Sequence, residues 1–423
     1  MGSTVIAIPD REDVAPKEKK KFRDFFLPII SFVREVDSKY DLRKLIHSIK
    51  VGVALVSVSL LYLVDPLYKQ VGENAMWAIM TVVVIFEFYA GATLSKGLNR
   101  GIGTILGGGL GCLAAAFAQD VGGIGNSIVV GISVFISGAA ATYMRLVPRI
   151  KKRYEYGTMI FILTFNLVVV SGLRAEEVMQ LARERLTTIV MGFVICIFIS
   201  LLVFPIWAGD ELHDSLTSKF EHLARSIEGC LEEYFKVDTE KENRPGFSLS
   251  SCKSVLHSKA KDESLANFAR WEPWHGKFRL SYPWKKYLKI GEVLRDMAAN
   301  VLSVKGCLQS PRQSLQNLRA SIKEPCEIVG SSLAWALREL GESIKKMNKC
   351  ETAGLIMPKL KSIRHELNLI ITPSALASVE KSTDALELAS FVFSLMEMVD
   401  KVEELTKEVE ELGGLAGFHA NSK

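Results

Sequence analysis

The chain has 423 residues, which leaves room for two domains of roughly 100 to 200 residues each. Hydrophobic residues make up 48% of the chain and concentrate before Gly209, whereas charged residues recur every few positions after it. The net charge of +5 is mildly basic, but lysine and arginine stand near the ends of predicted helices instead of forming one soluble basic surface, which argues against nucleic-acid binding.

The first half contains six apolar stretches long enough to cross a membrane as α-helices. A spanning helix needs about 20 mostly apolar residues, because each residue adds ~1.5 Å to a path of ~30 Å through the hydrocarbon. The predicted spans are residues 46–64, 75–94, 101–118, 127–147, 157–173 and 186–207. The sequence therefore predicts an all-α membrane protein with an N-terminal cytosolic segment 1–44, a six-helix membrane domain 45–208 and a helical cytosolic domain 209–423.

The distribution of lysine and arginine predicts which loops face the cytosol, because short cytosolic loops retain positive charge. Basic residues precede the first predicted span, Lys96 and Arg100 follow the second, and a basic run at 145–153 follows the fourth. The loops on the other side carry little net positive charge. Both termini are therefore predicted to be cytosolic.

After Gly209, apolar residues recur every three or four positions, which is typical of amphipathic helices. Residues 239–264 are polar and rich in serine, and are predicted to form a loop. The last helix has a heptad pattern of apolar residues and is predicted to stop at Gly413 and Gly414. The heptad fits either packing within one subunit or a contact between subunits.

Motifs of enzymes, metal sites and cofactor sites are missing from the sequence. There is no H-E-x-x-H, Walker A or G-x-S-x-G motif, and the seven cysteines include no C-x-x-C pair and no histidine at zinc-ligand spacing. Gly103, Gly107 and Gly111 are four residues apart inside the third span, so they share one helix face and allow close helix packing. We therefore predict no enzymatic activity, no metal and no cofactor.

Charged residues in or beside the spans are the candidates for function, because an ionisable group in hydrocarbon is costly and usually faces a partner or an aqueous path. Cations at both mouths of a path would attract anions and repel cations. The candidates for an anion pathway are Lys50, Lys96, Arg100, Lys152, Arg174 and Arg185. Each candidate also has an alternative interpretation. Cations on the cytosolic side are expected from the orientation of the helices in the membrane, and Arg174 and Arg185 on the other side could pair with neighbouring glutamates.

Glu87 is an acid within the second predicted span. It would oppose the flow of anions unless a cation neutralised it. We therefore predict that Glu87 pairs with Lys96 or Lys50 and has a structural or gating role.

Several long motifs follow one another along the chain. They are WAIMTVVVIFEF at 77–88, GATLSKGLNRG at 91–101, RYEYG at 153–157, FILTF at 161–165, VSGLR at 170–174, FPIWAG at 204–209 and WEPWHGKF at 271–278. In this order they closely resemble the motifs of the plant aluminium-activated malate transporter family. The resemblance extends over residues 42–290, and the last helix shows a weaker similarity.

The resemblance implies a homodimeric anion channel with a six-helix membrane domain and a helical cytosolic domain. Its expected partners are malate, other small anions and membrane lipids, and its expected location is the plasma membrane or the vacuolar membrane. By the same resemblance, Lys152, Arg174 and Arg185 match basic positions that the family uses for permeation.

The resemblance also extends to regulation. The tail signature, which contains Trp271, Glu272 and Pro273, is expected to have a structural or gating role. The segment that begins at Phe204 resembles the stretch proposed to sense GABA. Members of the family differ in whether aluminium activates them, so the resemblance does not imply that trait.

Two rival functions are open beside a passive anion channel. A coupled secondary transporter would need a site near the middle of the membrane, usually formed by a pair of broken helices, and the sequence shows no convincing pair. A membrane-anchored scaffold would need fewer spans and no charge inside the membrane. The sequence therefore favours the channel.

Overall fold

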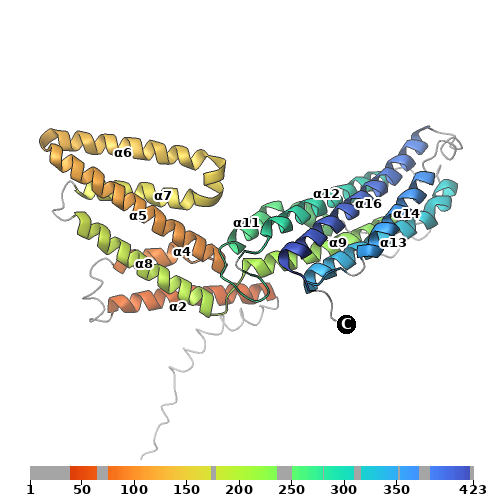
Figure 1. The fold of residues 1–423 in the computed structure, drawn as a ribbon, viewed down its shortest axis with the longest axis horizontal. Coiled ribbons are helices and arrows are strands. Elements are labelled where there is room, and N and C mark those ends of the chain that lie inside the picture. Colours follow the sequence, from red (N-terminus) through yellow and green to blue (C-terminus); the bar gives the residue numbers. More distant parts are fainter. Residues whose placement is uncertain are drawn as a thin grey trace, which may run out of the picture.

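The structure is a computed structural model that describes residues 39–63, 75–172, 178–235, 250–279, 281–308, 316–350, 353–370 and 382–419. Within these ranges the regular elements are α-helices, which confirms the all-α class. The helices form two bundles placed end to end (Figure 1). We term the first the apolar bundle and the second the tail bundle.

The apolar bundle contains α2 (Lys39–Leu63), α4 (Ala75–Ile85), α5 (Ala90–Val121), α6 (Gly123–Leu146), α7 (Pro148–Gly172) and α8 (Val178–Leu202). In the described part of the chain, four segments are long and apolar enough to cross a membrane: Ala90–Val121, Gly123–Leu146, Arg153–Ser171 and Arg185–Leu202. The helix α4 has 11 residues, fewer than the roughly 20 that a span needs. The number of six spans therefore stays a prediction.

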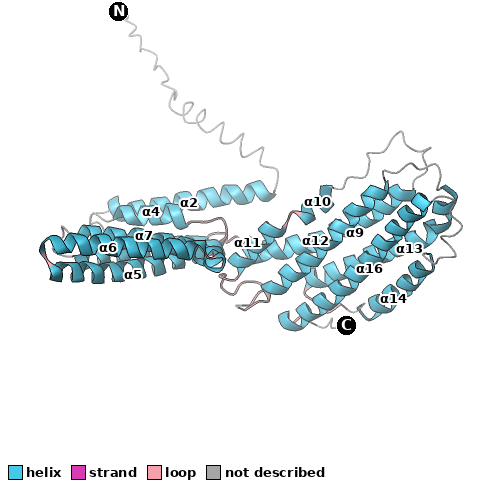
Figure 2. Ribbon diagram, turned by 90° about the horizontal axis from the view of Figure 1, so that it is seen from above, coloured by secondary structure: helices cyan, strands magenta, loops and turns pink. Residues whose placement is uncertain are grey.

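The helices of the apolar bundle lie in two groups. Figure 2 shows α2 and α4 on one side and α5, α6 and α7 on the other. The helix α8 contacts α2 and α4 as well as α5 and α7, so it joins the two groups.

A break at residues 86–89 separates α4 from α5, so the prediction of one continuous span at 75–94 is wrong. Within the break, the Glu87 N–H donates a hydrogen bond to the Thr93 hydroxyl at 3.0 Å. A side-chain oxygen that takes a backbone N–H in this way offers the chain an alternative to the helical ladder.

The break changes where the basic residues lie. The Ala90 N–H donates to the Ile206 carbonyl at 3.0 Å, which holds the start of α5 against the segment that follows α8. Because α5 begins there, Lys96 and Arg100 lie inside a helix and not in the predicted loop. Most of the basic run at 145–153 likewise belongs to the first turns of α7.

The glycine face of α5 packs directly against α7, which confirms the predicted close packing. A Cβ atom at Gly107 would lie 2.7 Å from the Phe161 carbonyl oxygen, and one at Gly103 would overlap the Gly157 carbonyl oxygen. Only a residue without a side chain lets the two backbones approach this closely.

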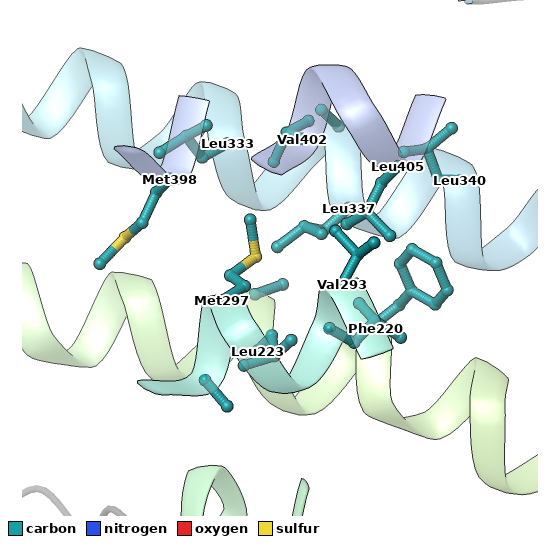
Figure 3. Packing of buried hydrophobic residues seen from close by; sticks show 14 of the residues in the cluster. Phe220, Leu223, Val293, Met297, Leu333, Leu337, Leu340, Met398, Val402 and Leu405 are labelled. Atoms are coloured by element: carbon teal, nitrogen blue, oxygen red, sulfur yellow. The ribbon is translucent and has the colours of Figure 1, made fainter. Parts of the chain in front are cut away.

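The tail bundle contains α9 (Ala208–Phe235), α10 (Ser250–Leu256), α11 (Lys259–Ala269), α12 (Trp284–Leu308), α13 (Gln316–Lys346), α14 (Ala353–Ile370) and α16 (Ser382–Ala416). All seven of these helices contribute to one apolar core, at whose centre Phe220 of α9, Val293 of α12, Leu337 of α13 and Val402 of α16 lie together (Figure 3). Burial of such side chains is the main force that holds a helical bundle together.

The heptad of α16 faces the core of its own chain. Its seven residues are all buried: Phe391, Leu395, Met398, Val402, Leu405, Val409 and Leu412. This confirms the interpretation as packing within one subunit. The predicted stop at Gly413 and Gly414 is wrong, because α16 continues to Ala416 and ends at Gly417, whose φ is +70°. The Phe418 N–H then donates to the Gly413 carbonyl at 2.9 Å, which closes the helix with a glycine C-cap.

The predicted loop at 239–264 is wrong where the structure describes it, because α10 and the start of α11 lie there. Cys252 and Val255 of α10 are buried in the core, and the Cys252 thiol donates to the Ala298 carbonyl at 3.2 Å. Residues 239–249 lie outside the described residues.

Candidate anion pathway

A cleft of about 880 Å³ lies where the apolar bundle meets the tail bundle. We term it the junction cleft. Its walls come from α5, from the α6–α7 turn with the first turns of α7, and from α11. Six cationic side chains line it, against the two carboxylates of Glu155 and Glu263; the cations are Lys96, Arg145, Arg149, Lys151, Arg153 and Arg270. The cleft therefore has a positive field that favours anions.

In the described part of the chain, protein groups contact only some of these cations, and carboxylates pair with two of them, Lys96 and Arg145. Arg145 pairs with Glu155 at 3.4 Å, and the guanidinium of Arg153 lies over the Trp271 ring at 5.8 Å from its centroid. Arg149 and Arg270 are exposed, and among the described residues neither has a carboxylate within the 4.0 Å of a salt bridge. An excess of positive charge therefore stays available in the cleft.

Arg100 is not among the residues that line the cleft, and it is only 7% exposed. Its Nη1 donates to the hydroxyl of Tyr156, a residue that lines the cleft, at 3.1 Å. Within the described ranges its Nε has no hydrogen-bond partner, and no carboxylate forms an ion pair with it. A buried guanidinium without a counter-charge is costly, so this position is suited to an anion.

A second cavity of about 430 Å³ lies between α5, α7 and α8. We term it the α8 crevice. Its wall is mainly apolar and is lined by small residues of α5, and Arg183 and Arg185 lie at one end. The Thr104 hydroxyl is buried in this wall and has no hydrogen-bond partner among the described residues. Arg185 lies over the Trp77 ring at 4.6 Å from the centroid.

The helices α5 and α7 contribute to both cavities. Asn99 of α5 lines the junction cleft and Thr104 of α5 lines the α8 crevice, and Arg100 stands between them in the sequence. On α7, Tyr156 lines the first cavity and Thr164 the second. Polar groups therefore follow one helix pair from one cavity to the other.

The structure brings together some of the predicted pathway residues and not others. Lys96 lines the junction cleft, Arg100 donates a hydrogen bond to Tyr156 in the cleft wall, and Arg185 lines the α8 crevice. Lys152 belongs to α7, in a stretch where its side chain is not described, and Arg174 lies outside the described residues.

The predicted partner of Glu87 is confirmed. The Lys96 ammonium forms a salt bridge with the Glu87 carboxylate across the start of α5. Both side chains are half-exposed at the edge of the junction cleft. The pair leaves the acid without a free negative charge beside the cationic wall.

Lys50 lines neither cavity. It is 2% exposed, and its ammonium donates to the carbonyl oxygens of Phe204 at 3.3 Å and Ser200 at 3.5 Å. Phe204 has a φ of +43°, a left-handed conformation that is unfavourable for a residue with a bulky side chain. Lys50 therefore satisfies carbonyls at the end of α8 and in the short segment between α8 and α9.

Glu272 caps the start of α9. Its carboxylate accepts hydrogen bonds from the N–H groups of Ala208 at 2.6 Å and Gly209 at 3.0 Å, and it is 5% exposed. Burial raises the pKa of the Glu272 carboxyl, while the two backbone N–H groups oppose the shift. A carboxylate at a helix N-terminus satisfies free N–H groups and interacts favourably with the helix dipole.

The rest of the tail signature supports this cap. The His275 ring stacks on the Trp207 ring with centroids 3.9 Å apart and planes 11° apart. The Pro273 carbonyl oxygen lies 2.9 Å from His275 Nδ1, which orients the ring. The signature thus fastens the tail bundle to the segment between α8 and α9.

Two parts of this arrangement were missed by sequence reasoning. Arg270 was not a candidate because it lies in the polar half of the chain, far in sequence from the basic run that it joins at the cleft. Glu272 was a candidate only by resemblance, and nothing in its neighbours indicates that it caps a helix more than sixty residues earlier.

The chain is similar to several known proteins. The profile of the family described as "Aluminium activated malate transporter" matches residues 38–375. The chain is 45% identical to Aluminum-activated malate transporter 14 of Arabidopsis thaliana over 337 residues, which cover 79% of this chain and 62% of the relative. It is 47% identical to Aluminum-activated malate transporter 12 of the same organism over 313 residues, which cover 74% of this chain and 56% of the relative.

The likeness extends to a cereal relative. The chain is 36% identical to Aluminum-activated malate transporter 1 of Triticum aestivum over 402 residues, which cover 92% of this chain and 86% of the relative. The chain spans less than two thirds of the length of the two Arabidopsis relatives above. With a matching profile over most of its length and several apolar helices of spanning length, this chain is a multi-pass membrane protein that belongs to the aluminium-activated malate transporter family.

Proposed function

We propose that the chain forms an anion channel that passes malate and related organic or inorganic anions across a plant membrane. Its relatives carry the name of malate transporters. The single observation that supports anion passage here is the buried Arg100 guanidinium, which lies beside a cationic cleft without a carboxylate partner among the described residues. No enzymatic step is part of this proposal.

The proposed route begins in the junction cleft. A dicarboxylate loses hydration energy when it leaves bulk water, and the field of the six lining cations offsets part of that cost. The anion then passes Arg100 and Tyr156, which offer charge-assisted hydrogen bonds. Several sites of moderate strength let an ion enter and leave, whereas one tight site would trap it.

The route continues along α5 and α7 to the α8 crevice. The free Thr104 hydroxyl provides a hydrogen-bond donor there, and Arg185 provides a cation at the far end. Lys152 keeps its proposed role because it stands between Lys151 and Arg153, which both line the junction cleft. Arg174 keeps its role on the family resemblance alone.

Orientation, assembly and location complete the proposal. We infer that both termini and the tail bundle are cytosolic, because the basic residues around the junction cleft then lie on the cytosolic side. A homodimer is supported by α6, whose span is only 11% buried within one chain and so leaves an apolar face for lipid or a second copy. The membrane is the plasma membrane or the vacuolar membrane.

Regulation is assigned to the segment between α8 and α9. The Glu272 cap and the ring stack of His275 on Trp207 fasten this segment to the tail bundle, which supports a structural or gating role for Trp271, Glu272 and Pro273. Phe204 begins the proposed GABA-sensing segment, and its exposed side chain would be accessible to a ligand.

The break between α4 and α5 is the feature that would favour a coupled transporter, because broken helices form the sites of such proteins. This break contacts the segment after α8 through Ala90 and Ile206. It therefore lies at the end of the apolar bundle that faces the tail bundle (Figure 1). In the proposed orientation that end is near the cytosolic surface of the membrane and not at its middle. We prefer the channel for this reason.

The test is a recording of the purified chain in a planar bilayer with a malate gradient. We expect the current to reverse at the malate equilibrium potential and to be unaffected by an added proton gradient. Arg100→Gln should lower the malate current about tenfold or more, because one charge-assisted contact is worth ~1.5–3 kcal/mol. The matched control is Arg225→Gln, which removes an exposed cation from the tail bundle. Unchanged conductance in Arg100→Gln, or a reversal potential that follows protons, would contradict the channel.

A further inference from the structure

We propose that the rim of the junction cleft binds the head group of a polyphosphorylated phosphatidylinositol from the adjoining membrane leaflet. The rim consists of three exposed cations, Arg149 and Lys151 at the start of α7 and Arg270 at the end of α11. This inference rests on the orientation proposed above, in which the cleft faces the cytosol, and not on anion conduction.

The three cations of the rim have no acidic partners among the described residues. Among the described residues no carboxylate lies within 4.0 Å of the ionised groups of Arg149, Lys151 or Arg270. Like charges held around one cavity repel each other, and a ligand with several negative charges removes that repulsion. The residues come from two bundles, so only a ligand that reaches both walls can use all three.

The size of the cleft favours a large polyanion over a small one. A volume of about 880 Å³ lies near the upper end of ligand sites, far above the need of one dicarboxylate. Arginine binds phosphate through two parallel hydrogen bonds, which makes Arg149 and Arg270 good partners for phosphate groups on a sugar-like ring. Of the two acids that line the cleft, Glu155 is paired with Arg145 at 3.4 Å, and the six cations outnumber Glu155 and Glu263 together.

The position of the rim favours a lipid over a soluble polyanion. The last turn of α6, a helix of spanning length, leads directly to the rim. Its apolar side chains point outward, with Tyr143 71% exposed and Leu146 73% exposed. Acyl chains could lie against this surface while the head group enters the cleft. Basic pockets at the cytosolic ends of spanning helices bind phosphorylated head groups in this manner.

The second wall is already positioned for the ligand. The Arg153 guanidinium lies over the Trp271 ring at 5.8 Å, which joins the start of α7 to the turn that follows Arg270. Trp274, in the same turn, is 75% exposed, and exposed tryptophan gathers at membrane interfaces. A bound head group would therefore fasten α11 of the tail bundle to α7 of the apolar bundle.

The test measures lipid binding to the purified full chain without any recording of current. Binding of a fluorescent phosphatidylinositol bisphosphate is followed by anisotropy, with three competitors: the same unlabelled lipid, soluble inositol trisphosphate and phosphatidylserine. The rim variant is Arg149→Gln with Arg270→Gln. The control variant is Arg225→Gln with Lys407→Gln, which removes the same charge from exposed positions of α9 and α16. Lys96 and Arg100 are unchanged in both variants, but the rim variant removes two of the six cations that line the proposed route, so lipid binding and not current is the readout.

We expect the rim variant to bind about 25-fold more weakly, since each basic residue near an anionic membrane contributes roughly fivefold. The control variant should bind like the unsubstituted chain, and the bisphosphate lipid should compete far better than the other two competitors. Equal competition by inositol trisphosphate would overturn the lipid assignment. Equal competition by phosphatidylserine would show that the rim attracts any anionic lipid and does not recognise the phosphorylated head group. Unchanged affinity in the rim variant would exclude these residues.

A second measurement keeps the inference testable if the rim variant does not fold. A photoreactive form of the lipid is cross-linked to the unsubstituted chain, and the adducts are mapped by mass spectrometry. Adducts are expected in the peptides 143–153 and 259–274, and adducts confined to other peptides would overturn the site. A chain that binds the lipid but passes no anion would refute the channel and leave this site intact, so the two failures are distinguishable.

Discussion

The Glu272 carboxylate accepts the backbone N–H of Ala208 at 2.6 Å, so a turn of the tail bundle supplies the cap for the helix that leaves the apolar bundle. The first N–H groups of a helix have no partner within the helix. Here the partner comes from a distant part of the sequence, the turn that follows α11, so the cap closes the end of the tail bundle that lies nearest to the apolar bundle. The cap therefore fixes the first turn of the helix through which the apolar bundle continues into the tail bundle.

The variant Glu272→Ala tests the cap. Loss of two hydrogen bonds to a buried carboxylate should lower the free energy of unfolding of the tail bundle by about 2–4 kcal/mol. We expect a lower melting temperature of the purified chain, followed by tryptophan fluorescence. Glu272→Gln keeps one acceptor oxygen and should lose less. Glu410→Ala removes an exposed carboxylate from α16 and serves as the control. Equal melting temperatures for Glu272→Ala and the control would show that the cap does not stabilise the tail bundle.

The variant Gly107→Ala tests the close packing of α5 on α7. The added Cβ would lie 2.7 Å from the Phe161 carbonyl oxygen, so the two backbones must separate. We expect less folded protein and a lower melting temperature, by an amount comparable to ~1–3 kcal/mol of overpacking. Gly101→Ala in the same helix meets no atom within 4 Å and should be neutral or slightly stabilising. If both variants melt alike, the glycine face is not needed for this contact.

The variant Glu87→Gln tests the role of the pair with Lys96. Loss of the carboxylate leaves the ammonium unpaired at the edge of the junction cleft. If the proposed channel is correct, the malate current should rise by up to about fivefold, which corresponds to the ~1 kcal/mol of a partly exposed pair. Lys96→Gln in the same background should reverse the gain. A current that falls in Glu87→Gln would instead indicate that the pair holds the helix break together.

His213 should make the stability of the tail bundle depend on pH. Its side chain is 6% exposed, and its Nδ1 lies 2.9 Å from the Tyr287 hydroxyl. Burial lowers the pKa of His213, while the nearby backbone of Lys345 partly opposes the shift. Because the folded pKa lies below the unfolded value of about 6.5, this contribution is present above pH about 6.5 and is lost as the pH falls through the folded pKa.

Melting curves between neutral and acidic pH check this expectation. The unsubstituted chain should lose stability as the pH falls below about 6.5, and His213→Gln should show a smaller loss over the same range. His257→Gln removes an exposed histidine and should keep the full pH dependence. A pH dependence that is unchanged in His213→Gln would assign it to other groups.

The sequence was sufficient for features that depend on local composition. Apolar runs predicted the four segments of spanning length in the described part of the chain, the four-residue spacing of glycine predicted the α5–α7 contact, and the heptad predicted the buried face of α16. Each of these features depends on residues that are neighbours on one helix. The pairing of Glu87 with Lys96 was also within reach, because both residues lie close together in the chain.

Features that depend on tertiary contacts were missed. The break at 86–89 lies in an apolar run that continues through it, and the contact of Ala90 with Ile206 that fixes it is not visible in either segment. The helix α10 was read as a loop because few apolar residues, among them Cys252 and Val255, anchor it to the core. The junction cleft likewise needs α11 folded back on α7.

The backbone contact between α5 and α7 restricts how the protein can change shape. At Gly103 and Gly107 the two helices touch without intervening side chains, so there is no compressible layer between them. The two helices must then move together as one rigid body. Any opening of the junction cleft must come from movement of α11 or the α6–α7 turn, and any opening of the α8 crevice from movement of α8, against this fixed pair.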